Sequence, residues 1–262
     1  MIKLYHGTTS VCAIKVRLVL AEKGLDWEGE ILNLQQGDQH TPEYLKLNPN
    51  GVIPTLVHDG NVIIESSIIL GYLDEAFPAP SLMPTDPVLR ARVRLWMKRV
   101  DDVLHAAIGV VTFATANRKV LIRKSPEDLA AHFARIPDPA YRERQRQSVE
   151  MGLAAPLVET AVRQYDKAAT QMEADLADTE FLAGDAWSLA DVALTPYINR
   201  AEMLGMEGLW ADRPNIARWF AAMKARPTYG PCIEDILSDA DRDRFDVPRG
   251  ETDARLRKIL AA

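Results

Sequence analysis

A proline-dense segment divides this sequence into two stretches with different hydrophobic patterns. The segment 77–87 contains four prolines, Pro78, Pro80, Pro84 and Pro87. Proline lacks a backbone N–H and restricts its own φ, so this density interrupts helices and sheets and predicts a linker. Before the linker, short strand patterns alternate with helix patterns, and after it the pattern is almost entirely helical. We therefore expect an α/β domain followed by an all-α domain.

The first 77 residues predict a β-α-β unit followed by a β-β-α unit. The predicted strands are Ile2–Tyr5, Trp27–Leu32, Pro54–His58 and Val62–Glu65. The predicted helices are Val11–Lys23, Pro42–Leu47 and one that begins near Ser66. Gly24 suits the end of the first helix, Asp59-Gly60-Asn61 predicts a hairpin turn, and the Ser66 hydroxyl is a candidate N-cap. A strand, a helix and a strand in this order predict a parallel pair.

The second half predicts a helical domain with recognisable helix starts. The expected helical stretches are Arg90–Asn117, one capped by Ser125, Ala140–Leu176 with a bend near Gly152 and Pro156, one opened by the capping box Ser188–Asp191, and Pro214–Arg226. After Ser238 the chain is charged and poorly periodic, and we expect loose packing there. The predicted organisation is a domain at 1–77, a linker at 78–87, an all-helical domain at 88–238 and a charged tail at 239–262.

Composition excludes several classes of protein. The formal net charge of −6 and the isoelectric point near 5.5 argue against nucleic-acid binding and against docking on anionic lipid. No window is long and apolar enough to span a bilayer, and the first ten residues, MIKLYHGTTS, lack the pattern of a signal peptide. Cys12 and Cys232 are far apart and form no zinc motif, so we predict no metal site and a reducing, cytoplasmic location.

Three motifs, in this order and spacing, resemble the cytosolic glutathione transferase family over nearly the whole chain. They are Thr8–Arg17 followed by Leu20–Gly24, then Asn48–Pro54 followed by Asp59-Gly60 and Glu65-Ser66, then Gly184–Asp191. The resemblance implies a thioredoxin-like N-terminal domain and an all-helical C-terminal domain. It also implies glutathione as co-substrate, a small hydrophobic electrophile as second substrate, a role in detoxification and a homodimer.

Ser10 is the predicted catalytic residue. It lies between the first strand and the first helix, where unpaired backbone N–H groups favour an anion and lower the pKa of a thiol. The resemblance places Ser10 where serine-type members hold the glutathione sulfur as a thiolate. Thr9 is the second candidate for this donor, and a plain helix cap is the alternative role for Ser10.

The other predicted site residues follow from the resemblance. It implies a cis bond between Ile53 and Pro54, with the Ile53 backbone pairing with the cysteinyl part of glutathione. Glu65 suits an ammonium group, and Ser66, at a helix start, suits a carboxylate, so the two are expected to bind the γ-glutamyl end. Gln39 and His40 are expected near the glycyl carboxylate. A solvated acid, a plain cap and a surface histidine are the alternatives for Glu65, Ser66 and His40.

Two other functions remain open from the sequence. Cys12 lies two positions after Ser10, and a thiol-disulfide oxidoreductase would use it as the nucleophile, although a small buried hydrophobe is the simpler interpretation. A glutathione-binding module without catalysis is the third hypothesis.

The helical domain is expected to select the electrophile. Its first long helix carries Trp96, Asp101, Asp102, His105, Ile108, Gly109 and Phe113. His105 is a weak candidate for a general acid, and the resemblance implies that Asp101 or Asp102 approaches the neighbouring subunit's glutathione. The segment from 117 to 173 is longer than in most members and resembles the branch that contains bacterial β-etherases. Arg17, Arg90, Arg92 and Arg94 are expected to be solvated.

Overall fold

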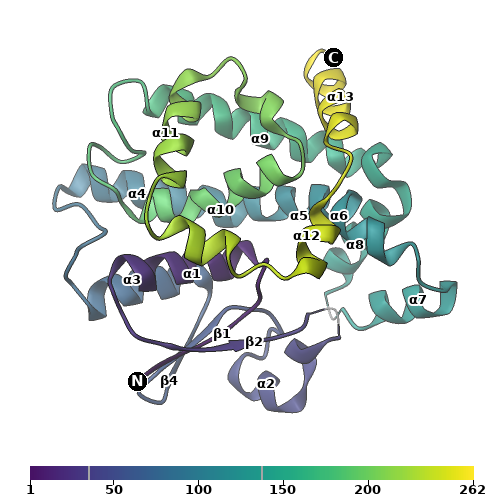
Figure 1. Cartoon of the computed structure of the whole chain (residues 1–262), viewed down its shortest axis with the longest axis horizontal. Coiled ribbons are helices and arrows are strands. Elements are labelled where there is room, and N and C mark those ends of the chain that lie inside the picture. The colour runs from purple at the N-terminus through teal and green to yellow at the C-terminus, as the bar shows by residue number, and fades with distance from the viewer. Residues whose placement is uncertain (35, 137) are drawn as a thin grey trace. The chain divides into compact units, whose positions relative to one another are not determined.

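The computed structural model (Figure 1) describes residues 1–34, 36–136 and 138–262. The chain divides into two compact units. The first unit contains Met1–Met97, Thr179–Pro196 and Phe220–Ser238. The second contains Lys98–Asp178, Tyr197–Trp219 and Asp239–Ala262. Thr179–Pro196 and Phe220–Ser238 come late in the sequence, but they pack with the N-terminal residues. The domain boundaries expected from the sequence stay a prediction.

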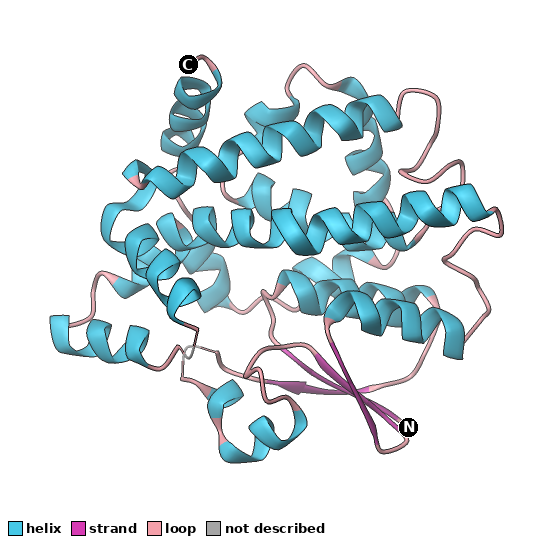
Figure 2. Ribbon diagram, turned by 180° about the vertical axis from the view of Figure 1, so that it is seen from behind, coloured by secondary structure: helices cyan, strands magenta, loops and turns pink. Residues whose placement is uncertain are grey.

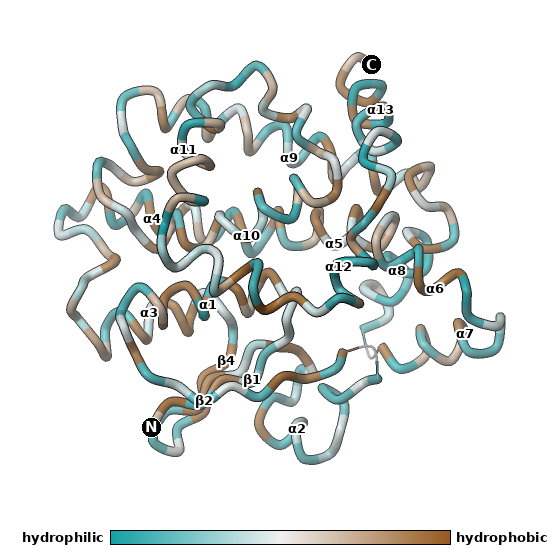
Figure 3. The backbone as a smooth tube through the Cα atoms, viewed as in Figure 1, coloured by the Kyte–Doolittle hydropathy of each residue, from teal (hydrophilic) through white to brown (hydrophobic). Residues whose placement is uncertain are grey.

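The sheet of the first unit has four strands in the order β2-β1-β3-β4. These are β1 (Ile2–His6), β2 (Glu28–Ile31), β3 (Thr55–His58) and β4 (Asn61–Ile64). β1 and β2 are parallel, whereas β3 is antiparallel to both β1 and β4. Figure 3 shows hydrophobic stretches among the strands, although β2 is mostly polar and exposed. This is the thioredoxin-like arrangement that the sequence predicted.

The predicted hairpin between β3 and β4 is confirmed. Asp59 and Gly60 have φ of 48° and 83°, and His58 pairs with Asn61 across this two-residue turn. Both central residues of a type I′ turn need positive φ, which glycine adopts freely and aspartate tolerates. The Asp-Gly pair therefore determines the register of these two strands locally.

Helices α1 and α3 lie on one side of this sheet and α2 on the other (Figures 1 and 2). Their bounds, with those of the neighbouring short helices, are α1 (Val11–Glu22), η1 (Asp38–His40), α2 (Pro42–Leu47), α3 (Ser66–Ala76), α4 (Pro87–Arg99) and η5 (Gly230–Glu234). Leu4, Leu20, Leu56, Ile69 and Leu73 are fully buried and form the centre of this core. α1 is buried around most of its circumference because it contacts both α3 and η5.

The start of α3 differs from the prediction. Ser66 is the first helical residue, and the N-cap position belongs to Glu65, which makes no side-chain cap bond. Glu65 has a φ of 67°, a strained value for a residue with a side chain. The strand therefore turns sharply at Glu65, and the helix begins one residue earlier than a Ser66 cap would allow.

The second unit is helical, and α5 packs against α8 and α9. Its helices are η2 (Val100–Leu104), α5 (His105–Ala114), α6 (Ala116–Leu121), α7 (Pro126–Ala134), α8 (Pro139–Met151), η3 (Gly152–Ala154), α9 (Pro156–Asp175), η4 (Glu207–Trp210), α12 (Asp239–Phe245) and α13 (Arg249–Leu260). α10 (Leu189–Met203) and α11 (Pro214–Lys224) each run from one unit into the other.

Most predicted helix signals are confirmed in this half. The Ser125 hydroxyl accepts from the Asp128 N–H at 3.1 Å. Asp191 Oδ2 accepts from both the backbone N–H and the hydroxyl of Ser188, at 3.0 and 2.8 Å, so this capping box is structural, as expected. The chain bends at η3, where Gly152 has a φ of 58°. The predicted single helix at 90–117 instead passes through the π-helical η2 and breaks at Thr115.

The expectation of loose packing after Ser238 is wrong. This stretch forms α12 and α13, and it buries Phe245, Val247, Leu256 and Ile259. Leu256 and Ile259 are three residues apart and share one face of α13. Charged residues surround these few apolar positions in the sequence. The hydrophobic periodicity is therefore weak, although the apolar side chains are buried.

Candidate functional site

The turn from β1 into α1 places Ser10 at the N-cap of α1. Its backbone is extended, with φ −69° and ψ 116°, and its Oγ accepts from the Ala13 N–H at 3.2 Å. A serine hydroxyl that accepts one bond still has its own hydrogen to donate. Among the described residues, no acceptor for that hydrogen is found. The first turn of α1 carries no acidic side chain, so the positive end of the helix is not neutralised from within.

The loop before β3 lies against this turn. The Ile53–Pro54 peptide bond is cis, as the resemblance implied. A Cβ added to Gly7 would lie 2.9 Å from Ile53 Cδ1, so the Gly7 backbone and the Ile53 side chain are in close contact. The fold therefore brings the second motif to the first at the end of β1.

Two side chains from α2 and its C-terminal end hold the loop in shape. The carbonyl of Val52 accepts from the Tyr44 hydroxyl at 2.6 Å and from Asn48 Nδ2 at 2.8 Å. Neither the N–H nor the carbonyl of Ile53 has a hydrogen-bond partner in the described part of the chain. Buried backbone groups are normally paired, so the unpaired Ile53 backbone is suited to an extended peptide laid alongside it.

Gln39 and His40, on η1, are brought to the same loop. Gly51 has a φ of 61°, and a Cβ on it would lie 2.8 Å from Cδ2 of His40 and 3.4 Å from the carbonyl oxygen of Gln39. The imidazole therefore packs on the Gly51 backbone. Among the described residues, Gln39 Oε1 is buried and has no hydrogen-bond partner, while its Nε2 lies at 3.5 Å from the Leu34 carbonyl oxygen.

Glu65 and Ser66 stand where β4 passes into α3. Lys15 of α1 donates from Nζ to Ser67 Oγ at 3.1 Å, and this bond ties the start of α3 to α1. Glu65 is exposed and Ser66 is buried at the helix start. A carboxylate and free helix N–H groups thus lie side by side, which suits a ligand carrying both an ammonium and a carboxylate.

Cys12 lies in the first turn of α1 and is partly exposed. The other cysteine, Cys232, is buried in η5, and burial raises the pKa of its thiol to about 11. Of the two, only Cys12 has the exposure and the helix-start position of a reactive thiol.

Arg17 is the residue that sequence reasoning misjudged. It was expected to be solvated, but it is only 2% exposed, and its guanidinium donates to the carbonyls of Gly7, Thr8 and Cys232. Its neighbours Val16 and Leu18 are buried as well. A helix with no polar face in this stretch was the signal in the sequence that its arginine would be buried too.

The residues expected near the electrophile belong to the helical unit, except for Trp96, which belongs to the first unit. Nδ1 of His105 lies 3.1 Å from the Tyr197 hydroxyl. Asp102 forms an ion pair with Lys98 at 2.6 Å. No catalytic role follows from either contact.

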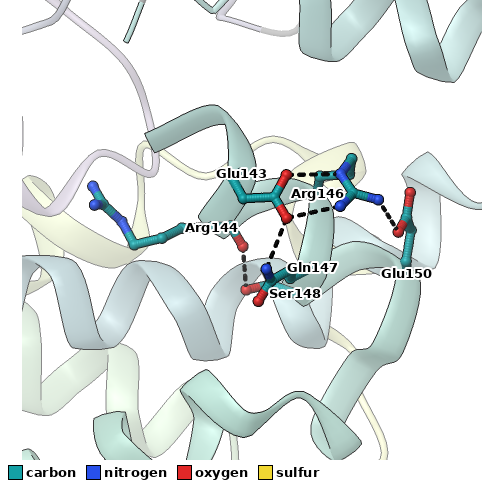
Figure 4. A network of polar contacts seen from close by, with 6 residues as sticks. All are labelled: Glu143, Arg144, Arg146, Gln147, Ser148 and Glu150. Carbon is teal, nitrogen blue, oxygen red and sulfur yellow. Dashed lines mark hydrogen bonds and ion pairs between the residues drawn. The ribbon is translucent and has the colours of Figure 1, made fainter. Parts of the chain in front are cut away.

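The long segment between α5 and α9 has a small hydrophobic cluster of its own. Leu121, Phe133, Ile136 and Val149 are buried together, and Phe113 and Leu129 pack against them. Pro137, in the stretch that suggested the β-etherase branch, lies outside the described residues. On the outer side of α8, Arg146 joins Glu143 and Glu150 (Figure 4), but these side chains are solvent-exposed and form a helix surface, not a site.

The described residues contain no group of three or more His, Cys, Asp or Glu side chains arranged to hold a metal ion. None of their helices combines the length and the hydropathy that crossing a bilayer requires.

Comparison with known proteins gives consistent results. Residues 9–76 match the model of the glutathione S-transferase N-terminal domain, and residues 133–227 match that of its C-terminal domain. Glutathione S-transferase 3 of Zea mays is 30% identical, over 90% of this chain and 94% of that protein. Protein LigF of Sphingobium sp. strain SYK-6 is 28% identical, over 92% of this chain and 95% of its own length. The crystal structure of the β-etherase LigF superposes with a TM-score of 0.80, covering 88% of this chain and 98% of that one.

Proposed function

Because this chain belongs to the glutathione S-transferase family, we propose that it binds glutathione beside Ser10 and transfers its sulfur to a small hydrophobic, aromatic electrophile. One observation carries the proposal. Ser10 Oγ accepts the cap bond of α1 and keeps its hydrogen for an outside acceptor, at the positive end of a helix. An anionic sulfur is the ligand that this arrangement stabilises.

Glutathione is held along its length by the predicted site residues. The carboxylate of Glu65 binds the α-ammonium group, and the helix-start N–H groups at Ser66 bind the γ-glutamyl carboxylate. The backbone of Ile53, before cis-Pro54, pairs with the cysteinyl unit, for which its unpaired N–H and carbonyl are the support. Gln39 and His40 bind the glycyl carboxylate, and the buried, unpaired Oε1 of Gln39 supports a side chain that reorients on binding.

Activation of the sulfur is electrostatic. A thiol with a pKa near 8.5 is only a few per cent ionised at pH 7. A hydrogen bond from Ser10 to the thiolate contributes roughly 1.5–3 kcal/mol, and the α1 N–H groups add to it. Since one pKa unit is about 1.4 kcal/mol, Ser10 alone lowers the thiol pKa by about one to two units.

A β-aryl ether is the electrophile that we propose to test first. The support is the similarity to LigF along nearly the whole chain, including the long segment between α5 and α9. In this reaction the thiolate forms a C–S bond to the carbon that bears the ether oxygen. The C–O bond breaks, its electrons leave with the oxygen, and the released phenolate takes a proton from solvent.

The test is a turnover screen with glutathione across β-aryl ethers, halo-aromatics, peroxides and disulfides. Formation of a thioether with an aryl ether or a halo-aromatic supports the transferase. Turnover of disulfides alone would overturn it, and glutathione binding without any turnover would indicate a binding module.

The second candidate, a thiol-disulfide oxidoreductase, is favoured by the position of Cys12 in the first turn of α1. If the transferase proposal is right, Cys12→Ser keeps most of the turnover, because the nucleophile comes from glutathione. Near-complete loss of activity in a folded Cys12→Ser protein, with a mixed disulfide on the wild type by intact mass, would transfer the chemistry to Cys12.

We further propose a cytoplasmic homodimer that serves in detoxification of such electrophiles. The support for a dimer is a set of exposed apolar side chains on α3 and α4. Ile68, Val88 and Leu95 are 63%, 70% and 66% exposed. Exposed apolar side chains of this size mark interaction surfaces when they are contiguous.

A further inference from the structure

The guanidinium of Arg17 is buried in the first unit and uses each of its three nitrogens. Nε donates to the Cys232 carbonyl, Nη1 to the Gly7 carbonyl and Nη2 to the Thr8 carbonyl, each at 3.0 Å. Nη1 also lies 3.2 Å from Nδ1 of His6. Arginine can only donate, so this ring nitrogen is the acceptor and the imidazole is neutral, with its hydrogen on Nε2.

Burial without a carboxylate makes this arginine unusual. Among the described residues no acidic side chain forms an ion pair with Arg17, and its acceptors are three backbone carbonyls and the neutral His6 ring. Burial lowers the pKa of Arg17 to about 10, which leaves it charged at neutral pH. A buried charge is costly unless it is fully hydrogen-bonded. An apolar side chain would fill the same volume more cheaply, so the guanidinium is expected to serve a purpose beyond packing.

The two carbonyls on its fork belong to the turn that leads to Ser10. Gly7 and Thr8 precede Ser10 by three and two residues, and the Gly7 carbonyl also accepts from the Ser10 N–H at 3.4 Å. Gly7 therefore receives a bond from the guanidinium and another from the catalytic serine's own backbone. A shift of the guanidinium would move the acceptor that orients Ser10.

Arg17 Nε donates to Cys232 of η5, which lies in the last stretch of sequence that belongs to the first unit. A second link joins the same region to α1, because Glu22 accepts from Arg226 Nε at 2.9 Å and from the Thr228 hydroxyl. The Arg17 link reaches the Ser10 turn, whereas the Glu22 link lies at the far end of α1. The two links can therefore be separated by mutation.

We propose that Arg17 is a positioning residue for the sulfur chemistry: its planar fork holds the Gly7–Thr8 turn so that the Ser10 hydroxyl is aimed at the glutathione sulfur. The proposal rests on the proposed function of Ser10. Lysine cannot replace the fork, since a single ammonium does not reach three carbonyls in different directions. Arg17 acts through the backbone of the turn and makes no contact with the sulfur in this assignment.

The test measures the pKa of enzyme-bound glutathione by the ultraviolet absorbance of its thiolate, in a two-by-two set of Arg17→Lys and Ser10→Ala. In the protein that keeps Ser10, Arg17→Lys raises the thiol pKa by about one unit and lowers kcat at pH 7 by about 3-fold to 8-fold, because less of the thiol is ionised. KM for glutathione stays nearly unchanged. In the Ser10→Ala protein, Arg17→Lys changes kcat by less than about 2-fold, because Arg17 acts through Ser10.

The control is Glu22→Gln, which weakens the other link between α1 and the segment near η5. It lowers stability in urea without changing the thiol pKa. An equal effect of Arg17→Lys in both backgrounds, or none in either, would overturn the proposal while leaving the proposed function intact. A Ser10→Ala protein that binds glutathione with an unchanged thiol pKa would instead overturn the proposed role of Ser10.

A second variant covers the case in which Arg17→Lys does not fold. His6→Leu removes the imidazole acceptor and leaves the three carbonyls in place. A smaller rise in the thiol pKa that vanishes in the Ser10→Ala background supports the proposal. No rise, or the same rise in both backgrounds, contradicts it.

Discussion

At the scale of single residues, the geometry of Ser10 is compatible with two roles that are alternatives when only the sequence is considered. The hydroxyl can be a helix cap or a donor to the substrate. In the structure it accepts from the Ala13 N–H and still has its hydrogen available, because a hydroxyl has both lone pairs and a proton. The helix cap and the sulfur donor are therefore compatible in one side chain.

Ser10→Ala is expected to lower turnover at pH 7 by about 10-fold to 100-fold, if chemistry limits the rate. The reason is the loss of one charge-assisted hydrogen bond to the thiolate. Activity should recover partly toward about pH 9, where more of a thiol with a pKa near 8.5 ionises unaided. Steady-state kinetics across this pH range are the measurement.

Two controls separate catalysis from folding in that experiment. Loss of the cap alone costs about 1 kcal/mol, so urea unfolding of Ser10→Ala should show a modest decrease in stability. Ser10→Thr keeps both the cap and the donor and should retain more activity. If folded Ser10→Ala has wild-type activity at pH 7, Ser10 is not in the site and Thr9 takes its place.

His6 is expected to make stability depend on pH. Burial, together with the positive charge of Arg17, lowers the pKa of His6 from 6.5 to about 4 in the folded protein. A group whose pKa is lower in the folded protein than in the unfolded chain contributes stability at pH values above its unfolded-state pKa. That contribution is lost as the pH falls. Between pH 6.5 and about 4 the free energy of unfolding should therefore decrease, by roughly 3 kcal/mol at most.

The measurement is urea unfolding at several pH values for the wild type and for His6→Gln. Glutamine keeps an acceptor for Arg17 but does not titrate, so its curve should be flatter. Comparing the two proteins cancels His132, whose pKa burial also lowers. Parallel curves for the two proteins would show that His6 has no part in the pH dependence.

At the scale of elements, the packing of α13 depends on a glycine outside it. Gly205 follows α10 with a φ of 79°, and a Cβ there would lie 2.6 Å from the Arg249 carbonyl oxygen and 2.7 Å from Arg249 Cα. Both contacts are with backbone, which cannot rotate away. Alanine at this position would have to displace the start of α13.

Gly205→Ala is expected to lower the free energy of unfolding by roughly 2–5 kcal/mol, the sum of a strained φ and an overpacked contact. Gly208→Ala is the matched control, since its Cβ would first meet Asp253 Oδ1, the mobile end of a side chain. It should cost less than about 1 kcal/mol. Equal losses for the two variants, measured in urea, would argue against this account of α13.

At the scale of the whole molecule, the proposed homodimer is the property that can be measured most directly. A double variant, Ile68→Lys with Leu95→Lys, places charges among the exposed apolar side chains of α3 and α4. It is expected to turn a dimer into a monomer at micromolar concentration, as measured by light scattering. Ile122→Lys is the control, because Ile122 is 52% exposed but lies on the helical unit. A monomeric wild type would contradict the proposal outright.

The sequence by itself determined the order of the strands and helices in the first 77 residues and the location of the candidate site. The α1 stop at Gly24, the Asp59-Gly60 turn and the caps at Ser125 and Ser188 depend on chemistry within a few residues. Such signals can be recognised in the sequence without knowledge of the tertiary packing. The motifs that contain Ser10, Ile53 and Glu65 were identified by their resemblance to the glutathione transferase family, and the roles of these residues stay predictions.

Only the tertiary structure decided which side chains are buried and what they hold. Arg17 bonds to Cys232, more than two hundred residues later in the chain, and no local pattern encodes a partner at that separation. α13 is helical although its sequence is charged, because Leu256 and Ile259 are buried in the helical unit. Short helices gain most of their stability from packing and little from propensity, so α13 became visible only in the folded chain.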